Sequence, residues 1–275
     1  MTPHADDDDF SSKQHILERD GCPIHYWLSG PVHSPLVVLT HGATVDHHTF
    51  DVQIPVLSQD YRVLTWDVRG HGLSQPIGKA FSIRAAVEDL LAILDQLGAQ
   101  EVSLVGQSMG GNIAQELLFL YPERVKALVA LDCACNTFKL SPLEKYALAI
   151  TPALLRLYPY DLLLHQAAER SATTSEAQHY IYEASRQLPR ESYITILVET
   201  SLCLHYEPDY KITKPLLLLR GDHDNLGNFK KIMPLWAKRD PNSSYIIVPD
   251  AGHCANQDNP AFVNQALLGF LQQHT

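Results

Sequence analysis

The feature that most constrains this chain is an alternation of short apolar, β-branched runs with longer runs of helical periodicity, which covers most of its 275 residues. Short apolar runs are typical of strands buried on both faces, and intervening helices are the connections that parallel strands need. The alternation therefore predicts an α/β protein with a mostly parallel sheet and helices packed on both of its faces.

Eight segments fit the description of a strand. The first two flank Asp20-Gly21, a dipeptide that favours a tight turn, and we expect them to form an antiparallel hairpin. The other six are rich in Val, Leu and Ile and make up the predicted parallel series. The predicted strands are residues 15–19, 24–28, 36–40, 62–66, 102–105, 125–131, 216–219 and 244–248.

Helices are marked most clearly by their ends. Ser82 is a good N-cap and Gly98 a good stop signal for the segment between them. The predicted helices are residues 83–97, the segment between Ser108 and Tyr121-Pro122, and residues 261–272. Between the sixth and seventh strands the alternation fails, and the Leu-, Ala- and Tyr-rich residues 136–210 indicate a helical insertion into a core formed by residues 1–135 and 211–275.

The insertion holds eight of the twelve tyrosines of the chain. Aromatic side chains dominate both packed interfaces and ligand pockets. The tyrosines therefore either pack the insertion against the core or line a pocket, and the sequence leaves both readings open.

Charge and composition exclude several classes of partner. The formal net charge is −10, with four of the acids in the run Asp6–Asp9, and no stripe of Lys or Arg is present. A chain of this kind lacks the electrostatic footprint for nucleic acid or an anionic membrane surface. The acidic N-terminal region is the opposite of a basic, then apolar, secretory signal, so we expect a cytoplasmic protein.

Metals and cofactors have no support in the sequence. The five cysteines are an odd, sparse set, which favours free thiols over a disulfide framework. His47 and His48 are adjacent, a spacing that rarely serves one metal ion, and are expected to be loop residues near an entrance. Neither G-x-G-x-x-G nor a P-loop lysine motif occurs. We therefore expect neither metal nor cofactor.

The segment Gly106-Gln107-Ser108-Met109-Gly110 stands between a predicted strand and a predicted helix. This is the context that a G-x-S-x-G nucleophile elbow requires, because a very tight turn needs small residues on both sides of the serine. The alternative is an ordinary strand-to-helix turn in which the serine is only a helix N-cap. The choice depends on whether a carboxylate and a histidine follow at later strand ends.

Both groups follow in the order that such a serine needs. The seventh predicted strand ends in Gly221-Asp222-His223-Asp224, and the eighth is followed by Gly252-His253. A histidine activates the hydroxyl and a carboxylate orients the histidine. Upstream, the strand 36–40 ends in His41-Gly42-Ala43, where the N–H of Ala43 is expected to form an oxyanion hole with the N–H of Met109. His41 is expected to be structural.

Together with Asp67-Val68-Arg69-Gly70-His71-Gly72 and Pro122-Glu123-Arg124-Val125, these motifs resemble the α/β-hydrolase fold family over nearly the whole chain. The resemblance implies an eight-stranded, mostly parallel sheet with a helical cap, residues 136–210, inserted after the sixth strand. It implies Ser108 as nucleophile and His253 as general base. Asp224 is the implied acid, with Asp222 and Asp132 as competing positions, and Asp67 and Arg69 brace a loop.

The resemblance implies a serine hydrolase that cleaves a carboxylic ester or lactone of a small, largely apolar molecule without a cofactor. Related proteins that open epoxides or displace halide carry Asp at the elbow. Because this chain has Ser108 there, the resemblance disfavours both of those activities. Two alternatives remain. One is a carbon–carbon bond hydrolase of ring-fission products, weakened because Cys254 rather than a Trp follows His253 closely. The other is a slow-turnover small-molecule receptor of the same fold. The substrate-binding residues and the oligomeric state are not predicted.

Overall fold

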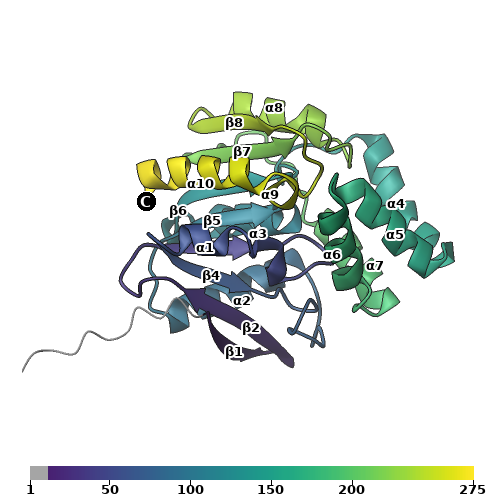
Figure 1. Cartoon of the computed structure of the whole chain (residues 1–275). Coiled ribbons are helices and arrows are strands. Elements are labelled where there is room, and N and C mark those ends of the chain that lie inside the picture. Colours follow the sequence, from purple (N-terminus) through teal and green to yellow (C-terminus); the bar gives the residue numbers. More distant parts are fainter. Residues whose placement is uncertain (1–11) are drawn as a thin grey trace, which may run out of the picture.

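A computed structural model describes residues 12–275, so the acidic run Asp6–Asp9 lies outside the described residues. These residues form one eight-stranded sheet (Figure 1). Its strands are β1 (Lys13–Arg19), β2 (Cys22–Ser29), β3 (Leu36–Thr40), β4 (Arg62–Trp66), β5 (Val102–Gln107), β6 (Val125–Leu131), β7 (Leu216–Gly221) and β8 (Ser243–Val248). The spatial order is β1-β2-β4-β3-β5-β6-β7-β8.

The sheet is mostly parallel, as predicted. β1 pairs with β2 and β2 with β4 in antiparallel register, while the remaining neighbours pair in parallel. The predicted hairpin turn is present, with φ of 51° at Asp20 and 79° at Gly21. Two successive positive φ values give a turn whose twist matches that of the flanking strands.

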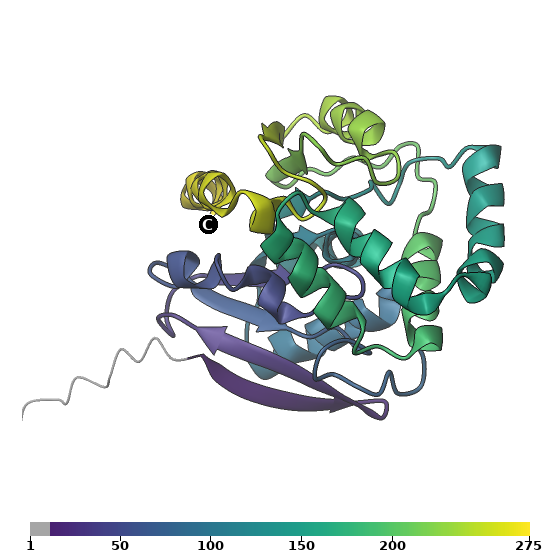
Figure 2. The same ribbon diagram turned by 45° about the vertical axis from the view of Figure 1, so that its right-hand side comes forward.

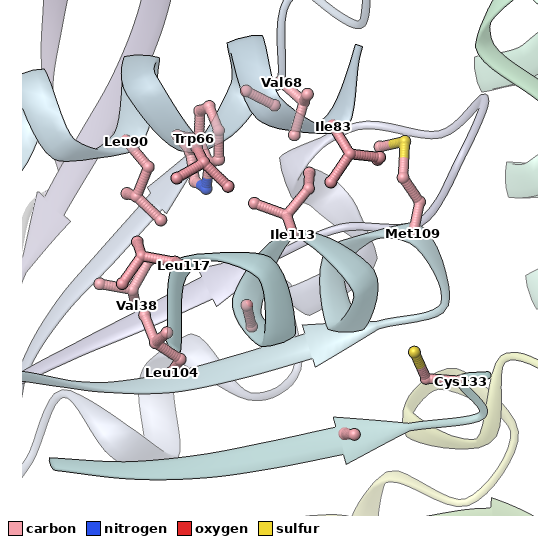
Figure 3. Packing of buried hydrophobic residues seen from close by; sticks show 14 of the residues in the cluster. Val38, Trp66, Val68, Ile83, Leu90, Leu104, Met109, Ile113, Leu117 and Cys133 are labelled. Carbon is pink, nitrogen blue, oxygen red and sulfur yellow. The ribbon is translucent and has the colours of Figure 1, made fainter. Parts of the chain in front are cut away.

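Successive residues of the central strands point to opposite faces and build two separate cores. Val38 and Leu104 face one core and Val37 and Val105 face the other. The first core, part of which is drawn in Figure 3, is covered by α2 (Ile83–Gln96), α3 (Met109–Leu120) and α8 (Phe229–Arg239). The second is covered by α1 (Ile54–Leu57), α9 (Ala255–Asp258) and α10 (Pro260–His274). The two 3₁₀ helices are η1 (His47–Phe50) and η2 (Pro122–Arg124).

The three helices predicted by their end signals are present within three residues of the expected bounds. Ser82 caps α2 through its side chain, which accepts a hydrogen bond from Ala85 N, and Gly98 beyond the helix has a φ of 66°. The prediction that β8 is buried on both faces is wrong. β8 is an edge strand, and the side chain of Ile247 is about half exposed. In residues 12–275 no helix is both long and apolar enough to cross a bilayer.

Four helices lie between β6 and β7: α4 (Pro142–Leu157), α5 (Tyr160–Ser171), α6 (Ser175–Ser185) and α7 (Arg190–Leu202). They form a group at one end of the sheet, at the right in Figure 1 and in front of the sheet in Figure 2. The two connections to this group run side by side, because His205 N donates to Asn136 O at 2.8 Å and Glu207 N to Thr137 O at 3.1 Å. We call α4–α7 the inserted helices.

Candidate active site

Ser108 stands at the junction of β5 and α3 in a backbone conformation that residues with a side chain rarely adopt, with φ 49° and ψ −115°. The turn is tight enough to demand glycine on both sides. A Cβ on Gly106 would lie 2.3 Å from the Gly110 carbonyl carbon, and one on Gly110 would lie 2.0 Å from Thr40 O. The sharp turn projects the Ser108 side chain away from the sheet.

The Ser108 hydroxyl faces a histidine rather than its own helix. Its side chain forms no capping bond with α3, and its Oγ lies 2.9 Å from His253 Nε2. His253 Nδ1 lies 3.0 Å from Asp224 Oδ2. The structure thus brings Ser108, His253 and Asp224 together in a hydrogen-bonded chain, from loops that follow β5, β8 and β7.

The three candidate carboxylates have different partners. Asp224 is fully buried, and its other oxygen accepts a bond of 2.9 Å from Leu226 N. Asp222 accepts from Ala251 N and pairs with the exposed His223. Asp132 is buried and accepts from Gly221 N at 2.7 Å, which ties β6 to β7. Burial, and then the charge of Asp224, raise the pKa of Asp132 well above its usual value. Of these carboxylates, only Asp224 is within hydrogen-bond distance of His253 in the described chain.

Two further residues hold His253 in place, and the sequence reasoning did not identify either. Gln107 Nε2 donates to His253 O at 2.8 Å. The ring of Phe229 stacks on the imidazole with centroids 5.1 Å apart and planes 15° apart. Gln107 is adjacent to the predicted serine, which is the one local signal that could have drawn attention to it. Phe229 opens a helix that was not predicted.

The loop after β3 borders the serine, as expected. A Cβ on Gly42 would lie 2.1 Å from Gln107 Oε1 and 3.5 Å from Ser108 Cβ, so this loop passes directly beside Ser108. The N–H groups of Ala43 and Met109 are not used in backbone hydrogen bonds between described residues. They are therefore free to donate to an oxygen beside Ser108.

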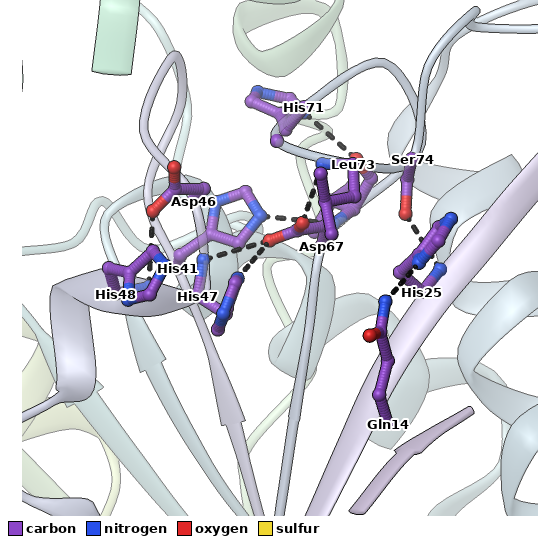
Figure 4. A network of polar contacts seen from close by, with 12 residues as sticks. Gln14, His25, His41, Asp46, His47, His48, Asp67, His71, Leu73 and Ser74 are labelled. Atoms are coloured by element: carbon purple, nitrogen blue, oxygen red, sulfur yellow. Dashed lines mark hydrogen bonds and ion pairs between the residues drawn. The ribbon is translucent and has the colours of Figure 1, made fainter. Parts of the chain in front are cut away.

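A polar network braces this loop and the one after β4 (Figure 4). Asp67 accepts from His47 N and Nδ1, at 2.9 and 2.8 Å, and from Leu73 N at 2.7 Å. His41 is fully buried, and its Nε2 accepts from Val68 N at 3.0 Å, so it braces the neighbouring loop as well as its own. Burial lowers the pKa of His41 to about 4 and that of His71 to about 3. Both rings are neutral at pH 7.

Arg69, the other residue expected to brace this region, forms a buried ion pair with Asp89 of α2. Its Nε and Nη2 each lie 2.6 Å from a carboxylate oxygen. The expectation that His47 and His48 are loop residues is wrong, because both lie in a 3₁₀ helix. They begin η1, where His47 contacts Asp67 and stacks on Trp27. In residues 12–275 no cluster of three or more His, Cys, Asp or Glu is suited to hold a metal ion, and all five cysteines are unpaired.

Ser108 and His253 open into a cavity of about 330 Å³ beneath the inserted helices. This volume suits a small molecule. Its walls are mainly apolar and are formed by the loop after β3, the elbow, the inserted helices and the loops after β7 and β8. The lining residues are Ala43, Thr44, Val45, Gln107, Ser108, Leu163, Gln166, Ala167, Arg170, Ser171, Ile181, Tyr193, Leu197, Leu226, His253 and Cys254.

The tyrosines of the insertion do not share one role. Tyr193 lines the cavity, and burial raises its pKa to about 12, so it stays neutral. Tyr180 is instead a structural link, because its hydroxyl lies 2.8 Å from Asp46 Oδ1 on the loop after β3. Tyr146 and Tyr206 are exposed. Neither of the two readings from the sequence therefore holds for the whole set.

Comparison with known proteins places this geometry in context. The family model described as "alpha/beta hydrolase fold" matches residues 35–260. Human epoxide hydrolase 4 is 25% identical over 94% of this chain and 78% of its own length. The putative carbamate hydrolase RutD of Stutzerimonas stutzeri is 26% identical over 91% of this chain and 97% of its own.

Among solved structures, a thermophilic esterase from Thermogutta terrifontis superimposes with a TM-score of 0.82 at 24% identity. The match covers 96% of this chain and 100% of that one. At this identity the structural match bears on the fold alone. The two sequence relatives cover most of this chain, and their names indicate hydrolytic reactions on different functional groups.

Proposed function

The chain belongs to the α/β-hydrolase family, and from this premise we propose that it is a serine hydrolase of small carboxylic esters or lactones that reacts through an acyl-enzyme on Ser108. The observation that carries the proposal is the hydrogen-bonded chain from Ser108 Oγ through His253 to Asp224, with links of 2.9 and 3.0 Å. Nucleophile, base and orienting carboxylate in this order are what acyl transfer requires.

In the proposed reaction His253 Nε2 takes the Ser108 proton as Oγ attacks the carbonyl carbon. The resulting oxyanion accepts hydrogen bonds from the N–H groups of Ala43 and Met109, and each such donor contributes roughly 10²- to 10³-fold in rate. His253 then returns the proton to the leaving alkoxide and the acyl-enzyme remains. Water, deprotonated by the same imidazole, attacks the acyl carbon and releases the carboxylic acid and free Ser108.

Asp224 acts in this scheme through the imidazole. Its buried carboxylate holds the proton on Nδ1, so that Nε2 carries the lone pair that faces Ser108, and it stabilises the imidazolium that forms. Phe229 and Gln107 restrict the ring and backbone of His253, which keeps the base in reach of the serine.

The nature of the nucleophile favours esters and lactones over epoxides. Epoxide opening in this family uses an aspartate at the elbow, which forms an alkyl-enzyme ester, and here the elbow residue is Ser108. A serine paired with a histidine suits attack on a carbonyl carbon. The likeness to the human epoxide hydrolase therefore supports membership of the family and does not extend the proposal to epoxides.

We also propose that residues 136–210 act as a cap, with residues 1–135 and 211–275 as the core. The cavity supports this division, because Leu163, Ile181 and Leu197 cover it from α5, α6 and α7. The inserted helices would then exclude water and choose the substrate, and the sheet would supply the reacting groups. The proposed partner is thus one small molecule held between the two parts.

The test is turnover of a panel of short-chain esters and small lactones by wild type and by Ser108→Ala. We expect the wild type to hydrolyse at least one class, and the variant to lose at least about 10⁴-fold in kcat/KM. His223→Ala serves as the control and should retain activity, because this histidine, in the loop after β7, is exposed. Full activity in Ser108→Ala would overturn the proposal, and binding without turnover would favour the receptor alternative.

A further inference from the structure

The last turn of α5 places one arginine in the wall of the cavity. Arg170 shares this cavity with Ser108 and His253. No Asp, Glu or Lys and no second Arg lines the cavity in the described part of the chain. Arg170 is exposed to solvent, and because guanidinium groups remain protonated in proteins it adds a positive charge to a wall that contains no carboxylate.

Backbone contacts fix this turn next to the reacting groups. Cys254 N, directly after His253, donates to Ser171 O at 2.9 Å. A Cβ on Gly252 would lie only 3.0 Å from the same oxygen, so the two backbones are in close contact. The turn that carries Arg170 is thus anchored beside His253.

Other arginines of the inserted helices already have partners. Arg156 pairs with Glu191 and Arg186 with Glu183, each at 3.1 Å. Arg190 donates to the carbonyls of Leu155 and Tyr158. Arg170 takes part in none of the ion pairs formed within residues 12–275. It is therefore the arginine of this group that both lines the cavity and lacks an ionic partner there.

A second donor lies one helical turn before Arg170. Gln166 and Arg170 are four residues apart on α5 and share the face that lines the cavity. The Gln166 amide is oriented by Tyr158, whose hydroxyl donates to Oε1 at 2.8 Å. Its NH₂ group is then the part that remains to donate to a ligand. The apolar Leu163 and Ala167 flank these two polar groups.

We infer that Arg170, assisted by Gln166, binds a carboxylate of the substrate. The inference rests on the proposed function and narrows it, since the ester or lactone would be apolar along its length and carry a free carboxylate distant from the scissile bond. A planar guanidinium matches a carboxylate through two parallel hydrogen bonds. The single positive charge of Arg170 would pair with the single negative charge of that carboxylate.

A competing explanation is purely structural. Arg170 lies in the last turn of α5, where a cation interacts favourably with the helix dipole. In that case its replacement would affect the stability of the fold and would leave the choice between charged and neutral substrates unchanged. The experiment must therefore measure discrimination rather than activity alone.

The test compares monoethyl adipate with ethyl hexanoate, which differ by the distal carboxylate, by the ratio of their kcat/KM values. We expect wild type to favour monoethyl adipate, and Arg170→Gln to lower that ratio about 10- to 100-fold, mainly through KM, with ethyl hexanoate turnover retained. Arg170→Lys should fall between the two. Arg186→Gln, which removes the paired arginine that directly follows α6, should leave the ratio unchanged. An equal ratio in wild type and Arg170→Gln would overturn the inference.

Binding separates this inference from the proposed hydrolytic function. Calorimetry with monoethyl adipate on Ser108→Ala needs no turnover, so it applies whether or not the esters are cleaved. We expect binding that weakens at least about tenfold when Arg170→Gln is added. Equal binding by the two variants, or no binding by either, would overturn the role of Arg170 even in an active hydrolase.

Discussion

The carboxyl edge of the sheet and helix α4 differ sharply in how far their side chains are buried. At the edge, Asp224 and His253 are buried and each has a hydrogen-bonding partner. Helix α4 has no buried residue, and Leu143 and Leu157 are 76% and 84% exposed. The proposed reacting groups are thus held at the sheet edge, and helix α4 buries no residue that could hold them.

The remaining inserted helices lie between these extremes. Thr173 N and Thr174 N donate to Asp258, and Ser185 Oγ donates to Thr44 O at 3.1 Å, so the α5–α6 region is anchored to the core. The cavity wall is built from these anchored helices and from α7 rather than from α4. Under the proposed function, the reaction would take place at the sheet edge and α5–α7 would select the substrate, whereas α4 contributes no residue to the cavity wall.

The largest expected effect distinguishes Asp224 from Asp222 at the sheet edge. Asp224→Asn should lower kcat about 10²- to 10⁴-fold, because the amide no longer holds the Nδ1 proton or stabilises the imidazolium. Asp222→Asn, a control on the same loop, should change kcat by less than about threefold. Steady-state kinetics on one ester checks both. A greater loss in Asp222→Asn than in Asp224→Asn would contradict the assignment.

Acid should destabilise the sheet edge through its buried histidines. The pKa of His41 is about 4 and that of His71 about 3 in the folded protein, below the ordinary value of 6.5. The unfolded chain then binds more protons below about pH 6.5, so stability is fully present above that pH and falls as the pH drops toward 4. Each of these two histidines should lower the free energy of unfolding by about 1–2 kcal/mol as the pH falls from 7 to 5.

Urea unfolding at several pH values measures this effect. In His71→Asn, where an amide nitrogen replaces the Nδ1 donor, the pH dependence between 7 and 5 should be shallower than in wild type. An unchanged slope would show that His71 is not the group responsible.

Loss of the Tyr180 hydroxyl should loosen the link between α6 and the loop after β3. Tyr180→Phe leaves the buried Asp46 without its 2.8 Å partner, which should cost about 1–3 kcal/mol of unfolding free energy. Tyr146→Phe, on the exposed surface of α4, is the matched control and should change stability by less than about 0.5 kcal/mol. Equal effects of the two substitutions would remove the distinction between anchored and peripheral helices.

The smallest effect is expected on α4 itself. Leu157→Ser should shift the unfolding free energy by less than about 0.5 kcal/mol, because the side chain is 84% exposed. Ile181→Ala on α6, where the side chain is buried, should cost about 2–5 kcal/mol. A large loss from Leu157→Ser would mean that this surface of α4 is covered in the folded protein.

The contrast between the buried sheet and the inserted helices also explains which features could be predicted from the sequence. Strands such as Leu36–Thr40 and Val125–Leu131 match their predicted bounds because burial of most of a strand on both faces requires a run of mainly apolar residues. Helix α8 was missed, since its helical pattern contains Pro234 and several lysines. The helix N-cap at Ser82 and the hairpin turn at Asp20-Gly21 were predictable, because each depends on neighbouring residues alone.

The reacting groups were predictable for a related reason, and the cavity wall was not. Ser108, Asp224 and His253 follow strand ends, and the topology of a parallel sheet brings such positions together. Arg170 and Tyr193 reach the cavity only because α5 and α7 dock on the core in a particular way. No local pattern encodes that docking, so nothing in the sequence distinguishes Arg170 or Tyr193 from the other arginines and tyrosines of residues 136–210.

The most direct test of the account is reaction with a fluorophosphonate, followed by intact mass and peptide mapping. We expect one adduct per chain, located on Ser108, absent in Ser108→Ala and formed much more slowly in His253→Ala. This result would identify Ser108 as a nucleophile activated by His253. An adduct at another residue, or no adduct on folded wild type, would contradict the central claim.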